Sequence, residues 1–189
     1  MGTPASDPLS PEDREELEEA GERARRFLKA GRVATFNVWT LGAFAGITLL
    51  FGLFSPEALV LGMGMGVVTW NEHRGRTLLR DIDPEGPRAL GRNQLGLMAL
   101  IVTYALWSLW QARTHPDPGL ARMDELMGGD TAGLVAELTT AVYLGVTALT
   151  ILFQGLLARY YFARAPMVET YLRETPEWVV QLQRSASLE

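Results

Sequence analysis

A row of polar side chains along residues 134–158 is the feature of this 189-residue sequence best suited to chemistry. Its members are Glu137, Thr140, Tyr143, Thr147, Thr150 and Gln154. Steps of three and four residues place them on one face of a helix. Because the rest of the segment is apolar, the row would cross a hydrocarbon layer, where polar groups need partners. Two interpretations stay open: hydroxyls that hold a helix bundle together, or a water-accessible path for an ion or polar solute.

Two other segments could supply side chains that face this row. Tyr104 and Ser108 lie in residues 95–112, and Asn37 lies in residues 33–54. These polar residues are sparser and alternate with bulky apolar ones, so a path would be narrow or would form only between several copies. Glu137 lies near one end of its segment, where it can reach water, and an interfacial acid is its simpler interpretation.

The sequence argues against an enzyme and against a bound cofactor or metal. It contains no cysteine and only two histidines, His73 and His115. His73 beside Glu72, with Asp81 and Asp83 further on, would make a poor metal site. We find no glycine-rich phosphate loop, nucleophile elbow or HExxH motif. The net charge of −5 also argues against nucleic acid as the main partner.

Four apolar segments would position the polar groups, at about residues 33–54, 56–71, 95–112 and 134–158. The first carries no formal charge and would be about 33 Å long as a helix, enough to cross a hydrocarbon core of about 30 Å. The second has an apolar stretch of residues 58–70 only, and spans only if its flanking polar residues lie at the interfaces. We predict an all-α fold, a four-helix transmembrane bundle with amphipathic helices on the cytoplasmic side.

The basic residues predict the orientation. Of the 17 lysines and arginines, all but Arg113 and Arg122 fall before the first segment, between the second and third, or after the fourth. A soluble bundle has no reason to separate its basic residues in this way, whereas the positive-inside rule does. We expect both termini to lie in the cytoplasm, with the bundle in a bacterial cytoplasmic (inner) membrane.

The opposite side would be acidic. It would carry Glu57, Asp117, Asp124, Glu125, Asp130 and, at the border, Glu137. Such an acidic mouth would concentrate cations, or it would only reflect the exclusion of lysine and arginine from that side.

The chain divides into an N-terminal segment 1–32, a transmembrane domain 33–158 and a C-terminal tail 159–189. Ser10, Pro11 and Asp13 predict the start of an amphipathic helix over residues 10–31. A second, short amphipathic helix is expected in the tail, after Thr175. The N-terminal helix would either orient the first span at the membrane surface or dock a partner or a neighbouring subunit.

Two pairs of glycines predict close helix packing. Gly42 and Gly46 share one face of the first span, and Gly62 and Gly66 share one face of the second. Small residues at this spacing let helix backbones approach in lipid. The short link between the two spans favours a tight hairpin within the chain, with contact between subunits as the alternative.

These features lead to two functional hypotheses. The first is a small homo-oligomeric channel or transporter-like protein for a cation or small polar solute, with the polar row lining the route. The second is a non-conducting membrane scaffold or complex subunit whose cytoplasmic helices bind a protein partner. In both, the lipid bilayer surrounds the helices.

Overall fold

The computed structural model describes residues 9–115, 118–127 and 131–186, and over these residues the chain is helical without a strand. Residues 1–8, 116–117, 128–130 and 187–189 lie outside the described residues. Asp117 and Asp130, two members of the expected acidic side, are among them. The helices are α1 (Pro11–Gly52), α2 (Pro56–Arg80), α3 (Glu85–Thr114), α4 (Pro118–Met127), α5 (Thr131–Phe162), α6 (Ala165–Glu174) and α7 (Glu177–Ala186). The all-α prediction is confirmed.

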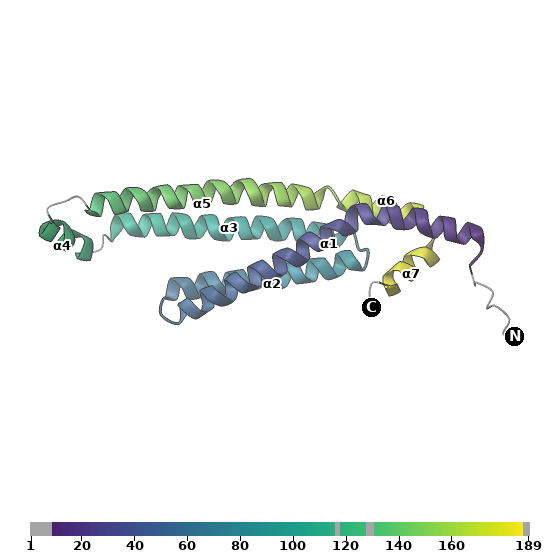
Figure 1. The fold of residues 1–189 in the computed structure, drawn as a ribbon, viewed down its shortest axis with the longest axis horizontal. Coiled ribbons are helices and arrows are strands. Elements are labelled where there is room, and N and C mark those ends of the chain that lie inside the picture. Colours follow the sequence, from purple (N-terminus) through teal and green to yellow (C-terminus); the bar gives the residue numbers. More distant parts are fainter. Residues whose placement is uncertain (1–8, 116–117, 128–130, 187–189) are drawn as a thin grey trace.

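The long helices form two hairpins that share one end of the molecule. α1 packs along α2, α3 packs along α5, and α2 joins the two pairs through its contacts with α3. The hairpins meet at the end that carries α6 and diverge toward the end that carries α4 (Figure 1). We refer to these as the α6 end and the α4 end. The N-terminal half of α1 extends beyond the other long helices and lies beside α6.

Three helical stretches in the described residues are long and apolar enough to cross a membrane: Pro11–Gly52, Glu85–Thr114 and Thr131–Glu174, which comprises α5 and α6. α2, which contains the expected span 56–71, is not among them. Its apolar stretch ends at Trp70 and is followed directly by Asn71, Glu72, His73 and Arg74. A fourth span and membrane embedding therefore stay predictions.

The expected N-terminal helix and the first apolar segment form a single helix, α1. Ser10 caps it, because its hydroxyl accepts a hydrogen bond from the backbone N–H of Asp13 at 3.1 Å. In return, the Asp13 carboxylate accepts the backbone N–H of Ser10 at 3.0 Å, as in a capping box. The Ser10 side chain and backbone both donate to this carboxylate and lower the pKa of Asp13. The predicted helix start is confirmed.

The buried core of the molecule lies at the α6 end. It is built from one stripe of α1, the α2–α3 turn, the end of α5, and α6 and α7; its members include Ala20, Ala24, Phe27, Ala30, Leu79, Ile82, Leu90, Tyr161, Val168, Tyr171 and Val179. Phe27 meets Tyr171 of α6 edge to face, with 5.3 Å between ring centroids. The apolar stripe of the predicted amphipathic helix is therefore covered by α6 and α7 of the same chain.

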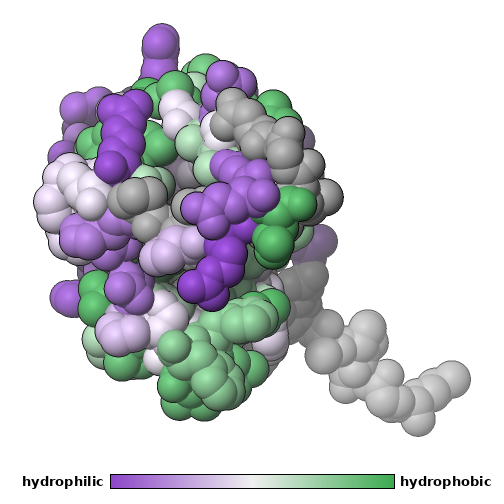
Figure 2. Space-filling model, turned by 90° about the vertical axis from the view of Figure 1, so that its left-hand side faces the viewer, coloured by the Kyte–Doolittle hydropathy of each residue, from purple (hydrophilic) through white to green (hydrophobic). Residues whose placement is uncertain are grey.

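Away from this core, the helices expose large apolar side chains. Trp39 is 76 % exposed, Trp70 is 70 % exposed and Phe54 is 89 % exposed. Figure 2 shows the α4 end, where the lower part of the view, over the α1–α2 turn, is mostly hydrophobic. An exposed apolar surface of this extent marks a region that a membrane or another protein covers.

A tight turn sets α3 against α2. Ile82 adopts a φ of 53°, the left-handed region that a β-branched residue seldom occupies. Its side chain is 1 % exposed, so burial in the core holds the strained backbone in place. Gly86 follows in α3, where a Cβ would lie 2.5 Å from the backbone nitrogen of Leu79. The turn thus brings the backbones of α2 and α3 into direct contact.

The four glycines predicted to pack α1 against α2 do not contribute equally. A Cβ at Gly62 would lie 2.9 Å from the Leu49 side chain and 3.0 Å from its backbone nitrogen, and one at Gly42 would meet Thr69 at an ordinary 3.6 Å. At Gly46 and Gly66 a Cβ would meet nothing within 4 Å. Of these four glycines, only Gly62 is required for the close approach within the hairpin, to which Gly52 also contributes with a Cβ position 2.7 Å from the Leu59 Cα. A contact between subunits stays open for Gly46 and Gly66.

Replacing Gly62 by alanine is expected to destabilise the chain, whereas the same change at Gly66 is not. Gly62→Ala forces α1 and α2 apart, a cost of about 1–3 kcal/mol for overpacking. Gly66→Ala adds helix propensity, up to about 1 kcal/mol, without a clash. Thermal unfolding in one detergent compares the two variants with the native chain. Equal stability of the two variants would contradict the packing described here.

Candidate functional site

The carboxylate of Glu72 lies where the four long helices meet. Glu72 is carried by α2 and is 0 % exposed. It is surrounded by Asn37 of α1, Asn93 and Gln94 of α3, and Tyr161 of α5. These five residues are referred to below as the Glu72 cluster. A fully buried glutamate is rare in proteins unless it is paired, which makes this cluster the candidate functional site.

Two side-chain amides of α3 bind the carboxylate from one side. The Nδ2 of Asn93 donates to Oε2 of Glu72 at 2.7 Å and to the carbonyl oxygen of Val68 at 2.9 Å. The Nε2 of Gln94 lies 3.1 Å from Oε1 and 3.0 Å from Oε2. Since Asn93 and Gln94 are adjacent in sequence, a single turn of α3 supplies both donors.

The other two partners come from the first and last long helices. The Nδ2 of Asn37 donates to Oε1 of Glu72 at 3.2 Å, and the Tyr161 hydroxyl donates to the same oxygen at 3.3 Å. Asn37 and Tyr161 also contact each other at 3.4 Å. Both carboxylate oxygens are thus hydrogen-bonded, and α1 and α5 are linked through the side chain of α2.

All four partners of Glu72 are uncharged. Ion pairs form away from the cluster, between Glu85 and Arg88 or Arg92 and between Arg88 and Glu169. Removing a carboxylate from water costs several kcal/mol, and neutral hydrogen bonds offset this cost only in part. An ionised Glu72 would therefore leave the cluster one positive charge short of neutrality, and either a proton or a bound cation would balance that charge.

Glycines beside the cluster allow this approach. A Cβ at Gly75 of α2 would lie 2.8 Å from the Leu90 side chain of α3, and one at Gly91 of α3 would lie 2.8 Å from the ring of Phe162 in α5. Each glycine lies within a helical turn of a cluster residue. Glycine at these two positions thus lets α2, α3 and α5 come close enough for side chains of α3 and α5 to hydrogen-bond to the Glu72 carboxylate of α2.

The predicted polar row of α5 faces α3 within the chain. Thr140, Tyr143, Thr147, Thr150 and Gln154 are half-buried, whereas Glu137 is exposed. α3 supplies Tyr104, whose ring lies 6.5 Å from that of Tyr143, and the half-buried Ser108. The row therefore occupies the α3–α5 interface, and its role as the lining of a path stays a prediction.

The hydroxyls of this row find few partners. The Thr140 hydroxyl donates back to the carbonyl oxygen of Ala136 at 2.8 Å. Thr147 Oγ1 and Gln154 Oε1 are buried without a hydrogen-bond partner in the part of the chain that the structure describes. Tyr143 contacts Tyr104 of α3, whereas the buried atoms of Thr147 and Gln154 add no hydrogen bond to α3 among the described residues.

The expected acidic side is dispersed, and part of it has a structural role. Asp124 of α4 accepts hydrogen bonds from the backbone N–H groups of Thr131 and Ala132, at 2.6 and 3.2 Å, and so caps α5. Glu57 accepts a hydrogen bond from Ser55 at the start of α2. Glu125 and Glu137 are exposed on α4 and α5.

Of the predicted path residues, Asn37 belongs to the Glu72 cluster. Helical periodicity also places Asn93 or Gln94 on the same row as Tyr104 and Ser108, whereas Glu72 and Tyr161 are site residues that sequence reasoning missed. A signal was present: all five polar residues lie near the same, arginine-rich end of an apolar segment. If the four segments are aligned as alternating spans, the five residues fall at one level.

Comparison with known proteins adds no family to this picture. No protein-family model matches the chain, and neither a curated protein nor a solved structure gives a significant match. The class that the structure itself defines is a helical protein with three helical stretches long and apolar enough to cross a membrane.

Removing the Glu72 carboxylate is expected to destabilise the four-helix junction. Glu72→Ala leaves the amides of Asn93 and Gln94 without their acceptor, at about 1–3 kcal/mol for each stranded donor. Glu137→Ala is the matched control, since an exposed glutamate should change stability by no more than about 0.5 kcal/mol. Thermal unfolding of both variants in detergent makes the comparison. A Glu72→Ala chain as stable as the control would show that the carboxylate does not hold the helices together.

Proposed function

We propose that this chain is a small transporter-like membrane protein that binds a cation at Glu72, in a bacterial cytoplasmic membrane with both termini inside. The observation that carries the proposal is a buried carboxylate at the meeting point of four helices whose hydrogen-bond partners among the described residues are all uncharged. An ionisable residue of this kind within a membrane bundle marks an ion or proton site by default.

Membrane embedding is supported by the distribution of apolar surface and charge. Large exposed apolar side chains follow α1, α2, α3 and α5 on the α4 side of the Glu72 cluster. The arginine-rich segments all belong to the α6 end, which the positive-inside rule assigns to the cytoplasm. The Glu72 cluster then lies near the cytoplasmic boundary of the hydrocarbon layer, within reach of ions from one side.

The side chains around Glu72 suit reversible binding of a hard cation. A carboxamide can present either its N–H or its C=O group to the same point. In the structure these amides donate to the carboxylate. Rotation of Asn37, Asn93 or Gln94 would turn amide oxygens toward a cation on Glu72, the type of ligand that such cations prefer. A proton would compete for the same oxygens.

The polar row of α5 is proposed as the remainder of the route. Tyr161, which belongs to the Glu72 cluster, lies further along the same helix, α5. Thr147 and Gln154 each have a buried polar atom that finds no partner among the described residues. Opening the α3–α5 interface would give those atoms water or an ion to bind. Assembly of several copies through the exposed apolar faces would complete the path, as the homo-oligomer hypothesis requires.

The alternative, a scaffold whose cytoplasmic helices bind a protein partner, has less support. The surface it would use is the apolar stripe of the N-terminal half of α1. That stripe already packs against α6 and α7, with Phe27 against Tyr171.

Cation binding is tested by thermal unfolding of the purified chain in sodium, potassium, lithium or choline chloride at constant ionic strength. A ligand at 100 times its Kd stabilises by about 2.7 kcal/mol, so at least one alkali cation should raise Tm relative to choline. Glu72→Gln should abolish the increase and Glu137→Gln should retain it. Failure of every cation to raise Tm between pH 5 and 9 contradicts a cation site.

Transport is tested in proteoliposomes with the same variants, by isotopic cation uptake under an imposed pH gradient. Uptake should occur with the native chain, be lost in Glu72→Gln and persist in Glu137→Gln. The double variant Thr147→Val/Thr150→Val keeps the volume of the row but removes two hydroxyls, and should slow uptake if the row belongs to the route. If the chain binds a cation but no proteoliposome preparation takes the cation up, the chain is a cation-binding protein and the transporter part of the proposal is wrong.

A further inference from the structure

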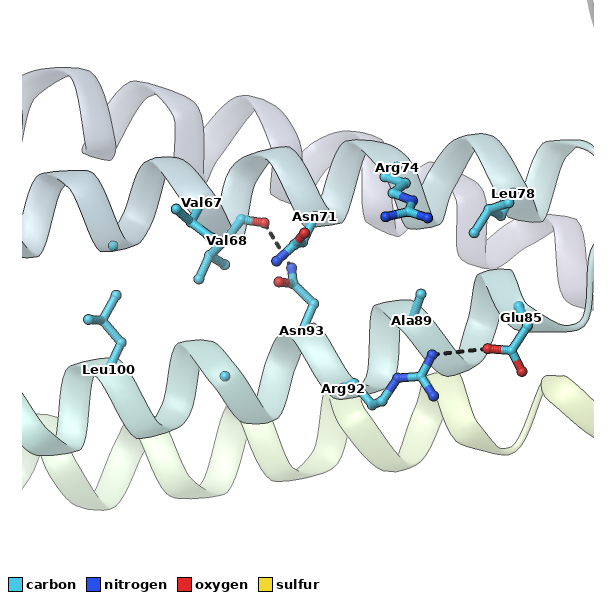
Figure 3. A pocket seen from close by; sticks show the side chains of 12 residues that line it. Val67, Val68, Asn71, Arg74, Leu78, Glu85, Ala89, Arg92, Asn93 and Leu100 are labelled. Carbon is cyan, nitrogen blue, oxygen red and sulfur yellow. Dashed lines mark hydrogen bonds and ion pairs between the residues drawn. The ribbon is translucent and has the colours of Figure 1, made fainter.

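A groove runs along the junction of α2 and α3, beside the Glu72 cluster (Figure 3). Its cavity volume is about 810 Å³. The walls come from Gly64 to Leu78 of α2 and from Glu85 to Leu100 of α3. Asn71 and Asn93 face each other near its middle. The groove thus extends from the apolar segments of the two helices to their arginine-bearing ends.

The two halves of the groove differ in chemistry. Toward the α4 end it is lined by Val67, Leu100 and the glycines at 64 and 96. A Cβ at Gly96 would meet nothing within 4 Å, so the groove is open there, whereas a Cβ at Gly64 would lie 2.8 Å from the Leu100 side chain, which closes the groove toward the α4 end. Toward the α6 end the lining includes Arg74 and Arg92, about one helical turn beyond the apolar stretches of α2 and α3.

The polar half of the groove has a net positive charge, because its lining includes Arg74, Arg92 and one acid, Glu85. This acid accepts hydrogen bonds from Arg92 at 3.0 Å and from Arg88 at 2.9 Å. Arg88, then Arg92, lower the pKa of Glu85 by these bonds. Arg74 forms no ion pair within the described residues. One guanidinium charge of the groove therefore has no counter-ion among these residues.

We propose that this groove binds an anionic phospholipid of the cytoplasmic leaflet, with its phosphate between Arg74 and Arg92 and an acyl chain along Val67 and Leu100. The charge complements a phosphate, the apolar half complements a hydrocarbon chain, and basic pockets between helices at this depth suit such headgroups. The inference rests on the proposed membrane embedding but not on cation binding at Glu72.

The test uses native mass spectrometry of the full chain in detergent, titrated with phosphatidylglycerol, phosphatidylcholine or inorganic phosphate. The native chain should bind phosphatidylglycerol at least tenfold more tightly than phosphatidylcholine. Arg74→Gln/Arg92→Gln should remove this preference, and Arg113→Gln/Arg122→Gln, an equal change in charge at the α4 end, should retain it. Gly96→Leu should fill the apolar half and weaken binding of both lipids, while Gly145→Leu on the open surface of α5 should not.

Each result has a defined consequence. Equal binding of the two lipids, or an unchanged preference in Arg74→Gln/Arg92→Gln, overturns the proposal. Binding of phosphatidylglycerol that inorganic phosphate displaces at equal concentration, with no effect of Gly96→Leu, would assign a phosphate site instead of a lipid site. Loss of cation stabilisation in Glu72→Gln with lipid preference intact separates the two sites, and a chain that stays monodisperse without detergent contradicts both proposals.

Discussion

A buried carboxylate held by uncharged hydrogen-bond donors is the constraint around which the described part of this fold is arranged. Glu72 accepts hydrogen bonds from three carboxamides and one phenol, contributed by α1, α3 and α5. Removing its charge from water is expensive, so the surrounding helices must hold these donors in place. The small residues at 75 and 91 and the strained turn at Ile82 serve this purpose, since they allow α2, α3 and α5 to converge.

The molecule has two halves of opposite character on either side of this carboxylate. The α6 end resembles a water-soluble domain: charged residues surround a core of alanines, Phe27, Tyr171 and valines of α6 and α7. The α4 side has little core and much exposed apolar surface, which suits lipid. The α2–α3 groove crosses the boundary between the halves, and Asn93 belongs both to its wall and to the Glu72 cluster. A lipid there would therefore touch a side chain that holds the carboxylate.

Local signals in the sequence predicted the long helices and the short helix after Thr175, but not α4, α6 or the site. Ser10 and Asp13 predict the start of α1, because a capping box involves residues three apart. Helical periodicity predicts the row from Thr140 to Gln154, but the helix that this row faces depends on the tertiary structure. Glu72 was missed as a site residue because its donors lie between 21 and 89 residues away. Gly62 and Gly66 are identical motif positions, and only the crossing of α1 and α2 distinguishes them.

The charge state of Glu72 tests the account most directly. Infrared difference spectra of the native chain minus Glu72→Gln, recorded in proteoliposomes, isolate the carboxyl vibration of this residue. The account predicts a band of the protonated acid at low pH that converts to the carboxylate band when an alkali cation is added at constant pH. A Glu72 carboxyl that keeps one form at every pH and cation concentration tested would contradict it.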